Sequence, residues 1–96
     1  MLKVAIAGAP GKMGTEAVHT MMKKDNVQLV AALDYKEIGN TLSELPNFPT
    51  DYKIPIYTNI ITLIEETKPD VLIDLTNPDS VYEHTKIALQ HNVRPV

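Results

Sequence analysis

Residues 2–14 read LKVAIAGAPGKMG, which is an apolar run, then a glycine-rich turn, then the first residues of a helical pattern. The run from Leu2 to Ala7 is continuous rather than alternating, as expected of a central parallel strand that is covered on both faces. The turn that follows needs backbone angles that are open mainly to glycine. The segment therefore predicts a strand, a tight turn and a helix, which together form the opening unit of a parallel α/β sheet.

The glycine turn is also a candidate anion site. The free N–H groups in the first turn of a helix attract phosphate, aided by the helix dipole, and glycine lets a diphosphate approach the backbone. Pro10 has no N–H to donate, so the expected donors are the amides of Gly11, Lys12 and Met13. We predict that the pyrophosphate of a dinucleotide binds at a set of six residues: Gly8, Ala9, Pro10, Gly11, Lys12 and Met13.

The same residues allow a second interpretation. The first two glycines are one residue further apart than in the pattern G-x-G-x-x-G. A tight strand-to-helix turn that binds no ligand would show the same sequence. Gly14 is expected to be structural in either case, because a glycine at this point lets the helix pack closely on the sheet.

Beyond the turn, strand patterns alternate with helix patterns. Strands are predicted at residues 27–33, 56–57, 70–75 and from 94 onward. Helices are predicted at residues 12–24, 59–68 and 78–91, with a mostly loop region at 35–55 that includes one helical turn from Thr41. The alternation predicts one dinucleotide-binding domain over residues 1–96, a Rossmann-type open parallel sheet with helices on both faces.

Apolar residues at helical spacing predict the buried face of each helix. The first helix is expected to bury Met13, Ala17, Val18, Met21 and Met22. The second is expected to bury Ile60, Leu63 and Ile64. The third is expected to bury Val81, Ile87, Ala88 and Leu89.

Two polar residues at strand ends extend the predicted site. Asp34 follows the second strand, where an acid normally accepts hydrogen bonds from the adenosine ribose of a dinucleotide. It should favour NADH by repelling a 2′-phosphate, although Lys12 and Lys36 can offset this, so NADH and NADPH both remain open. Thr76 ends the fourth strand and could contact the nicotinamide-side ribose; alternatively, Thr76 and Asn77 only cap the next helix.

Composition excludes several classes of function. The net charge is −3 and the nine Lys and Arg residues form no basic block, so nucleic acid is not an expected partner. No apolar run is long enough to cross a membrane, and the lack of cysteine fits a cytoplasmic protein. We expect His19, His84 and His91 to lie at the surface with no metal site, and Asp74 to organise hydrogen bonds at a strand end. No catalytic pair of side chains stands out.

Taken together, the motifs resemble those of bacterial dihydrodipicolinate (4-hydroxy-tetrahydrodipicolinate) reductases. The resemblance is carried by the turn from Gly8 to Gly14, by Asp34, by Asp74-Leu75-Thr76-x-Pro78 and by the closing Val93-Arg94-Pro95-Val96. The sequence departs from the usual family pattern at Pro10, at Leu75, where phenylalanine is common, and at Tyr35, where some members carry a basic residue.

The resemblance implies an NADH- or NADPH-dependent oxidoreductase of the diaminopimelate–lysine pathway. Such enzymes reduce a cyclic imine-type small molecule in the cytoplasm as homotetramers. The resemblance also implies that the substrate site, the catalytic residues and the tetramer contacts belong to a C-terminal α+β domain absent from this chain. Two alternatives remain: the cofactor domain of another NAD(P)-dependent dehydrogenase, or a non-catalytic nucleotide-binding module.

Overall fold

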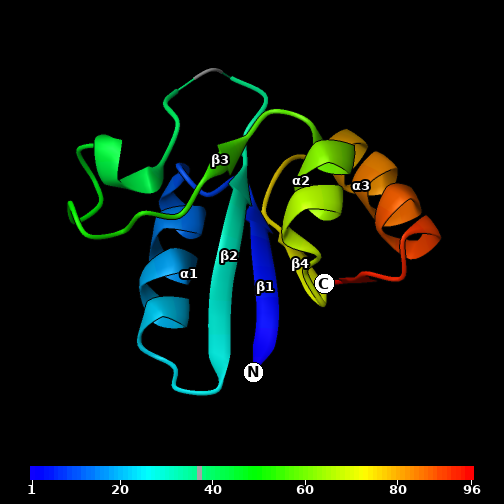
Figure 1. The fold of residues 1–96 in the computed structure, drawn as a ribbon. Coiled ribbons are helices and arrows are strands. Elements are labelled where there is room, and N and C mark those ends of the chain that lie inside the picture. The colour runs from blue at the N-terminus through cyan, green and yellow to red at the C-terminus, as the bar shows by residue number, and fades with distance from the viewer. Residues whose placement is uncertain (37) are drawn as a thin grey trace.

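Five parallel strands form one sheet in the computed structural model, which describes residues 1–36 and 38–96 (Figure 1). The strands are β1 (Leu2–Ala7), β2 (Val27–Leu33), β3 (Ile56–Tyr57), β4 (Val71–Asp74) and β5 (Arg94–Pro95), in the spatial order β3-β2-β1-β4-β5. The helices are α1 (Lys12–Met22), α2 (Ile60–Thr67) and α3 (Pro78–Gln90), and Leu42–Glu44 form a 3-10 turn. The predicted Rossmann-type α/β architecture is confirmed.

Alternate residues of the central strand β1 face two separate layers of apolar side chains. Val4 and Ile6 pack with Val18 of α1 and with the loop that precedes β3. Ala5 and Ala7 pack on the opposite face, which α2 and α3 cover. Helices therefore cover both faces of the sheet (Figure 1), which explains why β1 is apolar without alternation.

Side-chain caps fix where α2 and α3 begin. The Asn59 side-chain oxygen accepts from the amides of Ile61 and Thr62, at 2.9 and 3.2 Å, so it satisfies two of the free amides at the start of α2. The Asn77 side chain accepts from the Ser80 amide at 3.0 Å, and Pro78 occupies the first position of α3. The predicted start of α3 is confirmed, and α2 begins at Ile60, one residue after its predicted start. No helix in the described part of the chain has the length and apolar character to cross a membrane.

The predicted buried faces are correct for α2, wrong at Met13 and Met22 in α1, and wrong at Leu89 in α3. Ile60, Leu63 and Ile64 are buried as expected. Met13 is 68% exposed, because Gly14 begins the buried face of α1 and places that face one residue further along. Leu89 is 61% exposed, because Ala88 beside it is the residue that packs against the sheet.

The segment before β3 is mostly loop as predicted, but it also adds to the core. The helical turn expected from Thr41 is present, and the Thr41 amide donates to the Glu44 carboxylate at 3.2 Å. Leu42, Phe48 and Ile54 are buried against the α1 side of the sheet. The loop prediction at residue 37 lies outside the described residues.

Candidate functional site

The carboxyl ends of β1, β2 and β4 meet where the order of the strands reverses. The chain passes from β1 to β2 on one side and to β4 on the other, and ligands of open α/β sheets bind in the crevice at such a point. A cavity of about 180 Å³ lies there. Its lining includes Gly8 after β1, residues 34–36 after β2, and Thr76, Ser80 and His84 after β4.

Two glycines, Gly8 in the turn after β1 and Gly14 in the first turn of α1, are required by the fold. Gly8 has a φ of +81°, which is strained for any other residue, and a Cβ there would lie 3.0 Å from the Leu75 carbonyl oxygen. A Cβ on Gly14 would lie 2.1 Å from the Gly8 carbonyl oxygen. Gly14 is structural, as predicted, although the backbone it approaches is that of the turn itself.

Gly11 differs from these two glycines. Its φ of −68° and ψ of 168° suit any residue, and a Cβ would meet only the Gly8 carbonyl oxygen, at 3.4 Å. The Gly11 amide already donates to that oxygen at 3.2 Å. Of the three predicted phosphate donors, only the amides of Lys12 and Met13 therefore lack an acceptor among the described residues. The fold does not require glycine at position 11.

Asp34 is held in a local turn at the end of β2. Its amide donates to the Tyr57 carbonyl at 2.9 Å, and its Oδ1 accepts from the Lys36 amide at 2.8 Å. The carboxylate borders the cavity with only part of its hydrogen-bonding capacity used within this turn. It is therefore available to a hydroxyl-bearing ligand.

Thr76 belongs to a hydrogen-bonded group and does not cap α3. Its amide and its hydroxyl both donate to Oδ1 of Asp74, the amide at 3.0 Å. Asn77 alone provides the side-chain cap of α3. The expectation that Asp74 organises hydrogen bonds at its strand end is confirmed.

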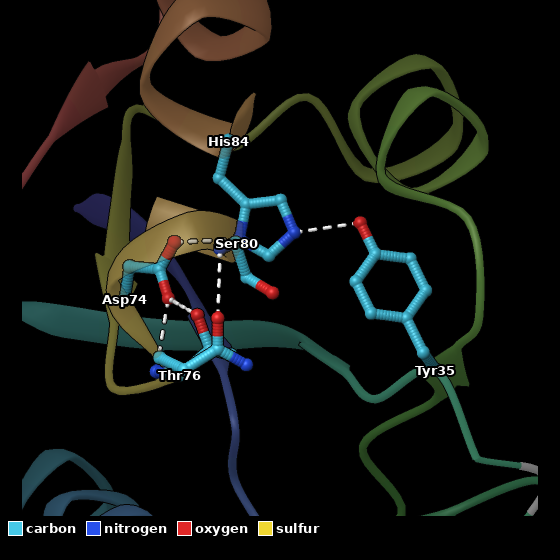
Figure 2. Close-up of polar contacts among 6 residues, drawn as sticks. Tyr35, Asp74, Thr76, Ser80 and His84 are labelled. Carbon is cyan, nitrogen blue, oxygen red and sulfur yellow. Dashed lines mark hydrogen bonds and ion pairs between the residues drawn. The ribbon is translucent and has the colours of Figure 1, made fainter. Parts of the chain in front are cut away.

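The prediction that His84 lies at the surface is wrong. His84 is 1% exposed, and its Nδ1 lies 2.6 Å from Oδ2 of Asp74 (Figure 2). Its Nε2 lies 2.7 Å from the hydroxyl of Tyr35, which reaches across from the end of β2. Burial is tolerated because both ring nitrogens have partners. We call this arrangement, Asp74, His84 and Tyr35, the histidine network.

The surroundings of the Tyr35 hydroxyl favour its protonated form. Burial raises the pKa of the Tyr35 phenol, and the carboxylates of Asp74 and Glu83 raise it further. The phenol therefore keeps its hydrogen at neutral pH and remains hydrogen-bonded to Nε2 of His84.

The other two histidines differ in their surroundings. His19 is half-buried beside Phe48 and Tyr52, at ring-centre distances of 5.7 and 5.8 Å, so its prediction as a surface residue is only partly correct. His91 is exposed as predicted. Among the described residues, no group of three or more acidic, histidine or cysteine side chains could hold a metal ion.

The structure brings together only part of the predicted site. Gly8, Asp34 and Thr76 line one cavity, although they are far apart in the sequence. Residues 9–13 lie outside that lining, and Ala9 is fully buried. The role of His84 was missed, yet Val81, His84 and Ala88 follow helical spacing on the inner side of α3, which is a signal of burial.

Comparison with known proteins identifies the family. A family profile described as "Dihydrodipicolinate reductase, N-terminus" matches residues 2–96. The chain belongs to the dihydrodipicolinate reductase family. The resemblance noted in the sequence is therefore confirmed over nearly the whole chain.

Members of the dihydrodipicolinate reductase family are close relatives in sequence and structure. The 4-hydroxy-tetrahydrodipicolinate reductase of Lysinibacillus sphaericus (strain C3-41) is 64% identical over 95 residues, which are 99% of this chain and 36% of that protein. A solved dihydrodipicolinate reductase from Paenisporosarcina sp. TG-14, with dipicolinate bound, is 57% identical with a TM-score of 0.82, covering 99% of this chain and 36% of that one. The chain thus spans about a third of the length of these family members.

The fold alone extends to more distant proteins. A scyllo-inositol dehydrogenase from Lactobacillus casei, solved with bound NAD(H) and scyllo-inositol, aligns with a TM-score of 0.78 at 14% identity, covering 99% of this chain and 27% of that one. At this identity the likeness concerns the architecture and not the chemistry.

Proposed function

We propose that this chain is the cofactor-binding part of a 4-hydroxy-tetrahydrodipicolinate reductase, an oxidoreductase of diaminopimelate and lysine biosynthesis that uses NADH or NADPH. Family membership and the 64% identity to a curated reductase support the assignment of the reaction. After the 4-hydroxyl group leaves as water, the reduced nicotinamide would supply the hydride that reduces the resulting C=N–C=C system. The residues of this chain bind and orient the dinucleotide.

The observation that carries the cofactor role is the backbone of Gly11. Its backbone angles suit any residue, and an added Cβ atom would contact only the Gly8 carbonyl oxygen. The fold therefore gives no reason for glycine there. A ligand that must approach the backbone closely does give such a reason. The amides of Lys12 and Met13 beside it need acceptors, and the helix dipole of α1 favours an anion. These features fit a pyrophosphate bound along residues 8–13.

Asp34 and Thr76 are proposed as the sugar contacts. The Asp34 carboxylate has capacity for the hydroxyls of the adenosine ribose, and its charge disfavours a 2′-phosphate. Lys36 lies two residues after Asp34 and Lys12 is exposed at the start of α1, so these two cations reduce that discrimination. The hydroxyl of Thr76 already donates to Asp74, so toward a ribose it can act as the acceptor of a hydrogen bond from a ribose hydroxyl.

The rest of the enzyme is proposed to lie outside residues 1–96. The relatives are almost three times as long as the matched segment, which leaves room for a C-terminal domain with the catalytic and substrate-binding groups. We propose that this further domain also forms a homotetramer, and that the enzyme acts in the cytoplasm on a small-molecule substrate.

Calorimetry with NADH, NADPH, AMP and CoA tests the proposed cofactor. We expect NADH and NADPH to bind more tightly than AMP or CoA. Tighter binding of CoA or AMP would instead indicate a nucleotide-binding module without redox function. In the full-length protein, reduction of 4-hydroxy-tetrahydrodipicolinate should accompany oxidation of the nicotinamide, and its absence would contradict the assigned reaction.

The variant Asp34→Ala tests the ribose contact. Loss of a hydrogen bond to a charged group should weaken the binding of NADH about tenfold or more. The binding of NADPH should weaken by less, because the variant also removes the repulsion between Asp34 and the 2′-phosphate. Asp51→Ala removes an exposed loop carboxylate away from the cavity and is the matched control. An equal loss for both nucleotides would contradict the assignment of Asp34.

A further inference from the structure

We propose that Tyr35, anchored by His84 and Asp74, is a fixed stacking platform for the adenine of the dinucleotide. The inference rests on the proposed function, because it concerns the base attached to the ribose that Asp34 is proposed to bind. It makes Tyr35 a binding residue, with His84 and Asp74 as positioning residues that act through it.

The orientation of Tyr35 is unusual for an exposed tyrosine. A surface tyrosine normally buries its ring and turns its hydroxyl to water. Tyr35 does the reverse: the residue is 56% exposed, while its hydroxyl points inward to Nε2 of His84 at 2.7 Å (Figure 2). The ring lies nearly parallel to the imidazole, with a ring-centre distance of 5.5 Å and an angle of 27°. An aromatic ring is therefore held in one orientation and partly open to solvent.

The anchor of this ring is rigid because it is buried and fully bonded. His84 is 1% exposed and is fixed by Asp74 on its other side, whose second oxygen is occupied by the amide and hydroxyl of Thr76. Polar networks of this kind restrict their members to one geometry when every group is satisfied. A platform ordered before binding loses little conformational entropy when a ligand stacks on it.

The position of the ring matches that of a nucleoside base. Tyr35 follows Asp34 directly, and both line the cavity of about 180 Å³. That volume is below the range of about 300–1,000 Å³ of pockets that enclose a drug-sized ligand, so the cavity suits one portion of a dinucleotide. Because the adenine is bonded to the ribose, a ribose on Asp34 places the base within reach of the adjacent ring. Aromatic stacking is a common way for proteins to bind bases.

The test measures binding of three probes to the full-length protein by calorimetry: NADH, ADP as the adenosine half and reduced nicotinamide mononucleotide as the other half. Tyr35→Ala removes the ring and should weaken the binding of NADH and of ADP about tenfold or more. Tyr35→Phe keeps the ring but frees it from His84, and should weaken both about threefold to tenfold. Binding of reduced nicotinamide mononucleotide should not change in either variant, whereas a general loss of structure would weaken it too.

A double-mutant cycle tests whether His84 acts through Tyr35. The side-chain amide of His84→Asn can still donate to Asp74 but is too short to reach Tyr35. His84→Asn should weaken NADH binding as much as Tyr35→Phe does, and the variant with both substitutions should bind NADH no more weakly than either single variant. Tyr82→Phe and His91→Asn change exposed residues of the same types and are the matched controls.

The outcomes separate this inference from the proposed function. If the unmodified protein bound neither NADH nor NADPH, the proposed function itself would be wrong. If it bound them and Tyr35→Phe bound NADH and ADP as tightly as Tyr82→Phe, only the platform would be refuted. Tighter binding by Tyr35→Phe would also overturn the platform, because the bond to His84 would then be blocking the site. Tyr35→Phe changes an exposed side chain, so the test does not depend on whether His84→Asn folds.

Discussion

Gly11 caps the start of α1 and Gly14 lies in its first turn, and the two positions are glycine for different reasons. Each variant therefore serves as the control for the other. A Cβ on Gly14 would overlap the Gly8 carbonyl oxygen, so Gly14→Ala should destabilise the fold by about 1–3 kcal/mol or more. Gly11→Ala should lower stability by less than about 1 kcal/mol, because alanine is only a poorer residue at a helix start. The Gly11→Ala variant should nevertheless bind NADH on the order of tenfold more weakly, since the new methyl group obstructs the approach of the diphosphate to the turn.

Urea unfolding and NADH calorimetry on the two glycine variants check this prediction. Gly11→Ala should weaken NADH binding with little loss of stability, whereas Gly14→Ala should lower the stability itself. Unchanged NADH affinity in a folded Gly11→Ala protein would mean that the turn binds no phosphate. The glycine would then have no explanation in either the fold or the ligand.

At the same scale, the sequence located individual site residues wherever a local rule applied. Gly8, Asp34 and Thr76 were predicted because each follows a recognisable strand, and the structure places all three on one cavity. The engagement of the Gly11 amide with Gly8 was not predictable, since it depends on the detailed path of the turn. The histidine network joins residues 49 positions apart in the sequence, and no local rule pairs Tyr35 with His84.

At the scale of helices and strands, patterns succeeded where one force dominates. Burial fixes β2 and caps fix the start of α2 and α3, so the bounds of β2 and the start of α3 agree with the prediction and the start of α2 differs by one residue. Patterns failed where packing selects among adjacent apolar residues. Met13 and Leu89 are apolar, but the small residues beside them, Gly14 and Ala88, make the close contacts.

Removal of the cap on α2 should destabilise that helix without affecting the nucleotide site. The Asn59 side chain satisfies two amides, so Asn59→Ala should reduce the free energy of unfolding by about 1 kcal/mol, which lowers Tm by about 4–8 °C in a domain of this size. Asn59→Asp keeps the acceptor and should retain most of the stability. Asn47→Ala in the exposed loop is the control, and an equal loss there would show that the cap has no specific effect.

At the scale of the whole molecule, the position of the site follows from the topology. The sheet is divided at β1, whose neighbours β2 and β4 carry the chain to opposite sides, and separate apolar layers cover its two faces. The alternation of strands and helices in the sequence was sufficient to predict this arrangement, because right-handed crossovers leave few other options. The cavity at this edge of the sheet brings together Gly8 of the glycine turn, Asp34, and Tyr35 and His84 of the histidine network.

A ligand bound across that edge should stabilise the entire fold, because it contacts segments from β1, β2 and β4 together. At an NADH concentration of about 100 times Kd, binding adds about 2.7 kcal/mol to the free energy of unfolding, which raises Tm by about 10–20 °C in a domain of about this size. Differential scanning fluorimetry at a series of NADH concentrations measures this shift. Gly11→Ala, compared at the same concentrations, should show a smaller shift from a similar starting Tm. An equal shift in both proteins would place the stabilising contact away from the glycine turn, since at one NADH concentration the stabilisation rises with the logarithm of the affinity.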